Sequence, residues 1–413
     1  MRKIIKEGYY YGALIYAFLI PFNQNLATLS LITWGLLSII NFKKSNINNN
    51  WHWAILPVFY FLYFIGFFSA DKIYFRFLET KLSFIIFPLI FVLHNYTVCQ
   101  RMKILKILVF GIFSSSLICI LYALFRSTNL IDQTIVFAAN VESGRDFMES
   151  VLYGGNYFFG RHLSIFHQTV YFALYICTGI SVLLFMPKLF LIRLRLFLII
   201  FFIMMLFLIS NKASFIATAG IFLIYLTTLN IPKTKKLIGL TIICGLIALF
   251  VYTNPRAKES INKVVQGELK IDKNARYGFG TRILSWDAAL TLIKENPIYG
   301  YGAGDTQLKL NSMYEKKEYK HPLNKSFNAH NQWFQSWLEN GIIAVIALVY
   351  IFYLLLTSAF KSSTNRGFYF ALFLILFINT LFESMFDRFS GVSFMSFVIC
   401  FILSEIKVDV LKK

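Results

Sequence analysis

Charged residues are scarce in this sequence of 413 residues: only 15% are Asp, Glu, Lys or Arg, whereas 57% are hydrophobic. Soluble domains carry about 25% charged residues, so this composition excludes an ordinary water-soluble enzyme. Apolar runs of about 17 to 25 residues, the length that a helix needs to cross a bilayer, recur along the chain. In lipid, helices satisfy the backbone of such runs. We therefore predict an all-α integral membrane protein.

The sequence also lacks the usual patterns of metal and disulfide sites. It contains no Asp-x-Asp and no His-x-x-x-His, and its five cysteines lie in or beside apolar runs. A metal-dependent transferase or a zinc hydrolase would lack its ligands. The glycine-rich run from Gly300 to Gly304 follows a helix stop and not a strand, so we interpret it as a turn rather than a nucleotide loop. We predict no bound metal and no cofactor.

Hydrophobic runs place about twelve membrane spans along the chain. The predicted spans cover residues 8–23, 25–42, 52–69, 77–95, 102–125, 163–186, 190–210, 212–229, 236–252, 332–358, 367–383 and 389–407. Residues 1–23 begin like a signal peptide, but no small-residue cleavage site follows, so we expect a retained first helix. The predicted regions are residues 1–252 with nine spans and a smaller loop at 126–162, a large polar loop at 253–331, and residues 332–413 with three spans and a tail.

Every second loop between these spans is basic. The basic residues are Arg2, Lys3 and Lys6; Lys43 and Lys44; Arg101 and Lys103; Lys188, Arg193 and Arg195; Lys233, Lys235 and Lys236; Lys361 and Arg366; and Lys407, Lys412 and Lys413. Because Lys and Arg favour cytoplasmic loops, we expect both termini in the cytoplasm and the loops 126–162 and 253–331 outside the membrane. This bias and anionic membrane lipids account for much of the net charge of +20 without nucleic acid.

The large loop 253–331 has more basic than acidic residues on the side where the positive-inside rule gives no reason for them. An anionic ligand would explain the excess; a solvated basic loop is the plain alternative. Within the loop, Thr281 is expected to cap a helix from Arg282 to about Glu295, ended by Asn296-Pro297. Arg282 lies on the apolar stripe of this helix. There its guanidinium could bind a phosphate oxygen; the alternative interpretation is an arginine that snorkels to the membrane surface.

A second helix is expected to begin near Asn328. Its apolar stripe holds His330, Trp333, Phe334, Trp337 and Gly341, and its other face holds Asn331, Gln332, Gln335 and Glu339. The helix dipole and desolvation both favour a neutral imidazole at His330, able to accept a proton. A satisfied core histidine is the alternative interpretation.

Four further residues are candidates for binding a ligand at the outer side. Lys212 lies in the short turn ISNKAS, Arg161 lies at the end of the smaller loop, and His167 lies at the membrane boundary. Glu383 follows the eleventh span in the turn FESMFDRFSG. With Asp387 at i+4 it would orient a base or bind an acceptor, although a local ion pair with Arg388 is the simpler interpretation.

These motifs together resemble the superfamily of O-antigen ligases and polymerases. The segment TRILSWDAALTLIKENPIYGYGAGD is similar to the family's Arg-headed helix followed by an Asn-Pro-x-x-Gly-x-Gly turn. His330-Asn331, nine residues and Gly341 are similar to the ligase signature of His-Asn, nine residues and Gly. Two positions depart from the family pattern, with Ala344 in place of Gly, Thr or Tyr and Lys212 in place of an arginine.

The resemblance implies a metal-independent glycosyltransferase of the inner membrane that moves an undecaprenyl-diphosphate-linked glycan at the periplasmic face. It assigns the binding of the diphosphate to Arg282, with Lys212 as a second cation, and general-base catalysis to His330. The acceptor is expected to be lipid A core, as for a ligase. Another glycan, as for a polymerase, or a Ser or Thr of an exported protein is the alternative.

A glycolipid transporter or flippase is the alternative from another class. Transporters usually contain repeated halves with matched broken helices, whereas the loop pattern here is lopsided and no internal repeat is visible. A flippase would use the same cations to bind the diphosphate but would need no base, so His330 separates the two hypotheses.

Overall fold

The computed structural model of the 413-residue chain describes residues 7–42, 51–68, 75–131, 133–141, 145–255, 257–258, 262, 271–276 and 278–404. Its helices are α2 (Gly8–Leu19), α3 (Gln24–Ile40), α4 (Ile55–Phe68), α5 (Phe75–Lys81), α6 (Ser83–Leu93), α7 (Val98–Ser127), α8 (Phe147–Tyr153), α9 (Thr169–Phe185), α10 (Ile192–Ile209), α11 (Lys212–Thr228), α12 (Lys233–Thr253), α14 (Gly278–Glu295), α15 (Thr306–Lys316), α16 (Lys320–Asn324), α17 (Gln332–Lys361), α18 (Arg366–Phe382) and α19 (Phe389–Leu403). Three short 3₁₀ helices are η2 (Trp51–Ala54), η3 (Gly160–His162) and η4 (Pro187–Leu189).

Helices lie close to the predicted spans, as expected for a multi-pass helical membrane protein. Four helices in the described part are long and apolar enough to cross a membrane, namely Val98–Ser127, Ile192–Ile209, Lys233–Thr253 and Gln332–Lys361, and several shorter apolar helices accompany them. The number of about twelve spans stays a prediction. Residues 1–6 and 405–413, and with them the predicted cytoplasmic ends, lie outside the described residues.

Two details of the predicted secondary structure were wrong. The single span expected over 77–95 is two helices, α5 and α6, which meet at Leu82. The all-α prediction was wrong for the smaller loop, because β1 (Thr128–Ile131) and β2 (Thr134–Phe137) pair as an antiparallel hairpin. The β-branched residues of these strands favour this pairing.

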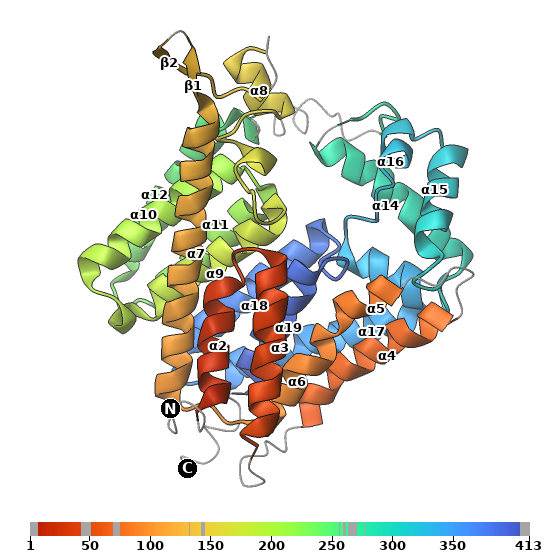
Figure 1. Cartoon of the computed structure of the whole chain (residues 1–413), viewed down its shortest axis with the longest axis horizontal. Helices are drawn as coiled ribbons and strands as arrows, with labels where there is room; N and C mark the ends of the chain where they lie inside the picture. The colour runs from red at the N-terminus through yellow and green to blue at the C-terminus, as the bar shows by residue number, and fades with distance from the viewer. Residues whose placement is uncertain are drawn as a thin grey trace. The chain divides into compact units, whose positions relative to one another are not determined.

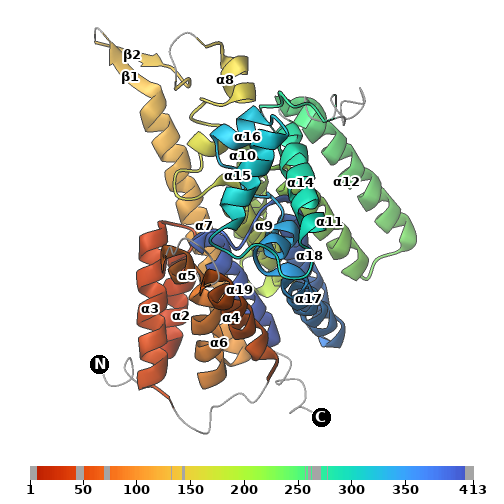
Figure 2. The same cartoon turned by 90° about the vertical axis from the view of Figure 1, so that its right-hand side faces the viewer.

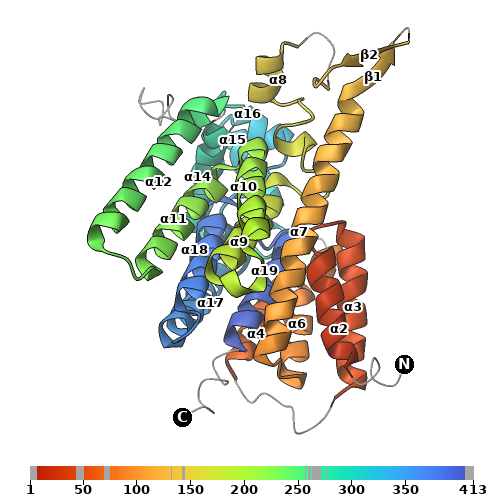
Figure 3. The same cartoon turned by 90° about the vertical axis from the view of Figure 1, so that its left-hand side faces the viewer.

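The chain divides into two compact units. The first comprises Met1–Asn41, Tyr96–Ile261 and Phe370–Ile375. Within it α2 lies between α3 and α7, and α9 packs against α7, α10 and α11 (Figures 1 and 3). A Cβ at Gly111 of α7 would lie 2.4 Å from the carbonyl oxygen of Phe18, so this glycine permits the close approach of α2.

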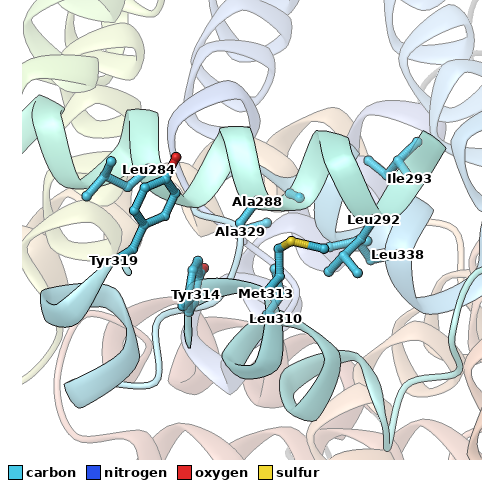
Figure 4. Packing of buried hydrophobic residues seen from close by; sticks show 11 residues of the cluster. Leu284, Ala288, Leu292, Ile293, Leu310, Met313, Tyr314, Tyr319, Ala329 and Leu338 are labelled. Atoms are coloured by element: carbon cyan, nitrogen blue, oxygen red, sulfur yellow. The ribbon is translucent and has the colours of Figure 1, made fainter. Parts of the chain in front are cut away.

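The second unit comprises Phe42–Asn95, Asn262–Tyr369 and Leu376–Lys413. Within it α17 packs against α4, α14 and α19, and α19 also contacts α5 and α6. Figure 2 shows α14, α15 and α16, which belong to the large polar loop, gathered beside one another. The loop helices share an apolar core that includes Leu284, Leu292, Leu310 and Tyr314, and Leu338 of α17 joins it (Figure 4).

The turn after α14 crosses α17 at Gly341. This residue has a φ of 68° and interrupts the helix. The N–H of Ile342 donates to the carbonyl of Ile298 at 3.2 Å, and the N–H of Tyr301 donates to the carbonyl of Leu338 at 2.7 Å. A Cβ at Gly341 would lie only 1.9 Å from the carbonyl oxygen of Ile298. The signature glycine is therefore required both by its positive φ and by the close backbone contact.

We predict that Gly341→Ala destabilises the protein by at least about 2 kcal/mol, because a side chain is strained at this φ and would also clash. A lower melting temperature of the detergent-solubilised protein would measure this loss. Gly245→Ala in α12 is the matched control, since nothing lies within 4 Å of its added Cβ. Equal melting temperatures for Gly341→Ala and the wild type would contradict the prediction.

Candidate active site

His330 precedes α17 and is not part of it. Asn331 is the N-cap, and its side chain accepts hydrogen bonds from the N–H groups of Trp333 and Phe334 at 2.9 and 3.1 Å. The helix start expected near Asn328 was therefore wrong, because Asn331 forms the cap. His330 has a φ of 45°, and its N–H donates to Oδ1 of Asn328 at 2.9 Å. A non-glycine residue in this region of backbone space is strained, which is common at functional sites.

The imidazole of His330 is paired with Glu383. Nδ1 of His330 lies 2.9 Å from Oε1 of Glu383, whose side chain is only 9% exposed. Glu383 is the first residue of the turn after α18, and the N–H of Ser384 also donates to its carboxylate at 3.2 Å. The His330 ring packs edge-on against Phe327, with ring centroids 5.0 Å apart. The carboxylate and the aromatic ring together fix the orientation of the imidazole.

Glu383 remains a carboxylate although it is buried. Burial raises the pKa of Glu383, but the hydrogen bond and charge of His330, the charge of Arg282 and the N–H of Ser384 together lower this pKa below its usual value. The expected ion pair with Arg388 was wrong. In the described part of the chain, Glu383 is hydrogen-bonded to His330 and ion-paired with Arg282.

Arg282 faces the same turn from α14. The helix begins at Gly278, four residues before Arg282, so Thr281 is not the expected cap; its hydroxyl donates to the carbonyl of Gly278 at 3.0 Å. Nε of Arg282 donates to the carbonyl of Phe382 at 3.1 Å, and a terminal nitrogen lies 3.9 Å from Oε2 of Glu383. The guanidinium is thus held by α18 and its turn, and is not a snorkelling side chain. A guanidinium has five N–H donors, so these contacts leave donors for an anion.

Two hydrogen bonds connect the elements that carry this triad of side chains. Nε1 of Trp286 in α14 donates to the carbonyl of His330 at 3.3 Å. Nδ2 of Asn331 donates to the carbonyl of Leu381 in α18 at 3.0 Å. The contacts of Asn331 orient α17, and its role in binding a substrate stays a prediction.

An ion pair also holds α14 against the segment between α15 and α16. Nζ of Lys317 lies 2.5 Å from Oδ2 of Asp287, and the hydroxyl of Tyr319 donates to the same oxygen at 2.7 Å. Burial raises the pKa of Asp287, but the bonds and charge of Lys317 and the bond from Tyr319 outweigh it, so the pKa is lowered. Both side chains are less than a third exposed, at 29% and 23%. The pair therefore stabilises the helix that carries Arg282.

The other three candidate residues lie in the first unit. Lys212 is the first residue of α11 and half-buried, directly after the turn that Ser210, with a φ of 55°, makes. Arg161 is exposed in η3. The buried ring of His167 packs edge-on against Tyr175 at 5.2 Å between centroids. The structure brings together Arg282, His330 and Glu383, whereas ligand binding by these three other residues stays a prediction.

Sequence reasoning missed Asn328 and the direct contact between Glu383 and His330. The signal for Asn328 was an asparagine two residues before His330, the spacing at which an Asn side chain accepts from the backbone. The signal for Glu383 was an acidic residue directly after an apolar span. Among the described residues, no group of three or more His, Cys, Asp and Glu side chains is placed to hold a metal ion.

Fold and site together define a helical membrane protein with an imidazole, a carboxylate and a guanidinium in contact beside a polar loop. Residues 168–349 match the O-antigen ligase family model. This segment contains Arg282, His330 and Gly341 and ends before Glu383.

Two curated proteins are similar to parts of the chain. An O-antigen ligase of Salmonella typhimurium is 28% identical over 135 residues, which cover 32% of this chain and 32% of the relative. An uncharacterized protein of Haemophilus influenzae is 36% identical over 83 residues, which cover 20% of this chain and 21% of the relative. The chain thus matches only about a third and a fifth of the length of these relatives. The family match and the Salmonella relative support the resemblance to the O-antigen ligase superfamily.

We predict that the Asp287–Lys317 pair makes the packing of α15 on α14 dependent on pH. Because the folded pKa of Asp287 is lowered, its stabilisation is present above the unfolded pKa of about 3.9 and is lost as the pH falls through the folded pKa. Asp287→Asn should remove this pH dependence. At neutral pH it should lower the stability of the packing by about 1 kcal/mol, which corresponds to amide exchange that is about fivefold faster. Hydrogen exchange of the 306–317 peptide would measure both effects.

Glu318→Gln is the matched control for this prediction. Glu318 pairs with Lys273 at 2.6 Å, but the two side chains are 70% and 55% exposed, so water screens the pair. Equal exchange rates in Asp287→Asn and Glu318→Gln would show that the Asp287 pair contributes nothing of its own.

Proposed function

We propose that this protein is a glycosyltransferase that moves an undecaprenyl-diphosphate-linked glycan to an acceptor hydroxyl. The observation that carries the proposal is the 2.9 Å contact between Nδ1 of His330 and a carboxylate that also faces Arg282. The O-antigen ligase family match supports a ligase-type reaction. The reaction would take place at the periplasmic face of the inner membrane, with both termini in the cytoplasm.

The His330–Glu383 pair suits general-base catalysis. An ionised Glu383 accepts a hydrogen bond from Nδ1–H, and this tautomer leaves Nε2 unprotonated. Nε2 can then take the proton of the acceptor hydroxyl as the oxygen attacks the anomeric carbon. The Glu383 carboxylate stabilises the imidazolium that forms, as the aspartate does in a Ser-His-Asp triad.

Arg282 is placed to stabilise the leaving diphosphate. When the bond between the anomeric carbon and the diphosphate oxygen breaks, the electron pair stays on that oxygen, and a guanidinium held in advance stabilises the new charge. Lys212 is proposed as a second cation for the diphosphate. No nucleotide, metal or cofactor is needed, because the diphosphate is already an activated leaving group. Direct displacement by the acceptor would invert the anomeric configuration.

The proposed acceptor is lipid A core, because the Salmonella relative is named an O-antigen ligase. A second lipid-linked glycan, for a polymerase, or an exported protein, for an O-oligosaccharyltransferase, would use the same base and cation. Glu383, Asn331, Arg161 and His167 are the proposed contacts of substrate. A glycolipid flippase needs no base, so the pairing of His330 with a carboxylate favours the transferase.

We predict that His330→Ala lowers turnover about 10²–10⁴-fold, as loss of a general base does. Glu383→Gln should lose a similar factor, because its amide can donate to Nδ1 and would favour the tautomer that has no acceptor on Nε2. The assay combines the purified variant, the lipid-linked glycan and each acceptor in turn. Both variants should still bind the donor. His52→Ala is the control, and wild-type turnover by His330→Ala would make the histidine a packing residue.

We predict that Arg282→Lys loses much of the activity and Arg282→Ala loses more. Lysine keeps the charge but cannot form the paired hydrogen bonds by which a guanidinium binds phosphate. The same assay measures this loss, with Arg388→Lys as the matched control, since Arg388 is exposed at the end of the same turn. Chelation with EDTA should change nothing. Full activity of Arg282→Lys would argue against paired binding, and a requirement for Mg²⁺ would contradict the metal-independent mechanism.

A further inference from the structure

Lys81 is a completely buried lysine at the end of α5. Its Nζ lies 4.4 Å from the ring centroid of Phe77 and 4.9 Å from that of Tyr63, and it donates a hydrogen bond to the carbonyl of Phe386. A buried charge is costly unless it has partners, and within membrane proteins such charges are usually functional. The partner of Lys81 is a backbone group of the turn that follows Glu383.

Phe386 anchors this turn through both of its backbone groups and its ring. Its N–H donates to Oε1 of Gln332 at 2.6 Å, and its carbonyl accepts from Lys81. Its ring packs edge-on against Phe84 at 4.9 Å and against Phe59 at 5.4 Å. The turn is therefore held by α5 on one side and by α17 on the other, and it cannot shift without breaking a buried hydrogen bond.

Both members of the His330–Glu383 pair depend on this turn. Glu383 begins it, three residues before Phe386. At its other end, Oδ2 of Asp387 accepts a hydrogen bond from Nδ2 of Asn328. Oδ1 of Asn328 in turn accepts from the N–H of His330 at 2.9 Å. The turn thus fixes the carboxylate directly and the backbone of the histidine through Asn328.

Lys81 also compensates negative charge near the pair. Its electrostatic partners are Asp387 and Glu339, and Asp387 and Glu383 repel each other within the turn.

We propose that Lys81 is a positioning residue for glycan transfer. Its ammonium binds the carbonyl of Phe386 and so holds the turn in the arrangement in which Glu383 meets Nδ1 of His330. Lys81 contacts neither the acceptor nor the diphosphate. The use of this arrangement in catalysis rests on the proposed function, whereas the arrangement itself can be tested without any substrate.

The substrate-free test is the rate at which diethyl pyrocarbonate modifies His330, measured by mass spectrometry of the peptide from the full-length protein in detergent. Loss of a hydrogen bond to a charged group frees Nδ1, so Lys81→Met should raise the rate about tenfold or more, as should Glu383→Ala, which removes the carboxylate without adding a donor. Lys81→Arg, which keeps the charge and a donor, should raise it less. Lys106→Met is the control, because Lys106 also lies over an aromatic ring, that of Phe190, at 5.9 Å.

Lys81→Met leaves buried carboxylates without a cation and can fail to fold. The double variant Lys81→Met with Asp387→Asn removes the carboxylate that lies in the turn and still lacks the bond to Phe386, so it should fold more readily than Lys81→Met and still show fast modification. Asp387→Asn alone, which keeps Lys81, should be modified more slowly than the double variant. Slow, wild-type modification of His330 in folded Lys81 variants would overturn the proposal.

The activity assay then separates positioning from a purely structural role. Lys81→Met should lower kcat about tenfold or more and leave the KM for the lipid-linked donor unchanged. When it is combined with Glu383→Gln, the double variant should lose little more activity than Glu383→Gln alone. Additive losses, or a KM effect with normal kcat, would contradict the proposal. A wild-type protein with no transferase activity would refute the proposed function, and His330 modification would still decide whether Lys81 holds the turn.

Discussion

The contact between Nδ1 of His330 and Oε1 of Glu383 is the interaction on which the candidate site depends. It joins a strained residue before α17 to a turn after α18, and these two segments are 53 positions apart in the sequence. The carboxylate is buried, so the pair is stable only because His330, Arg282 and the N–H of Ser384 all compensate its charge. An ionised Glu383 accepts a hydrogen bond from Nδ1–H, so the same compensation favours the tautomer in which Nε2 can accept a proton.

The surrounding polar groups serve mainly to hold this pair. Gln332 and Lys81 bind the two backbone groups of Phe386, and Asn331 binds both the first turn of α17 and the carbonyl of Leu381. Each of these polar side chains is buried and hydrogen-bonded, which is the condition under which a polar network gives one arrangement rather than several. Burying so many polar groups in an apolar protein costs free energy. The network surrounds Glu383, which is consistent with the catalytic role proposed for this residue.

The sequence predicted the helices well and the site only in part. Long apolar runs gave the helices close to their observed limits, because burial in lipid requires the same residues that define the run. Helix starts at Arg282 and near Asn328 were misplaced, since caps depend on which of several neighbouring polar side chains finds a backbone N–H. The break between α5 and α6 was missed because Glu79 and Lys81 are the only charged residues in the apolar run 77–95, which is otherwise typical of a single span. The partner of Lys81, the carbonyl of Phe386, has no signature in the sequence.

The position of Glu383 between His330 and Arg282 also couples the two halves of the proposed reaction. In the resting site the carboxylate interacts with both, at 2.9 Å from the imidazole and 3.9 Å from the guanidinium. When His330 takes a proton, the imidazolium becomes the stronger partner of Glu383. Arg282 is then less neutralised at the moment when negative charge develops on the leaving diphosphate. Proton transfer from the acceptor would therefore strengthen the cation that the donor needs, and a neutral glutamine at position 383 could not link the two events.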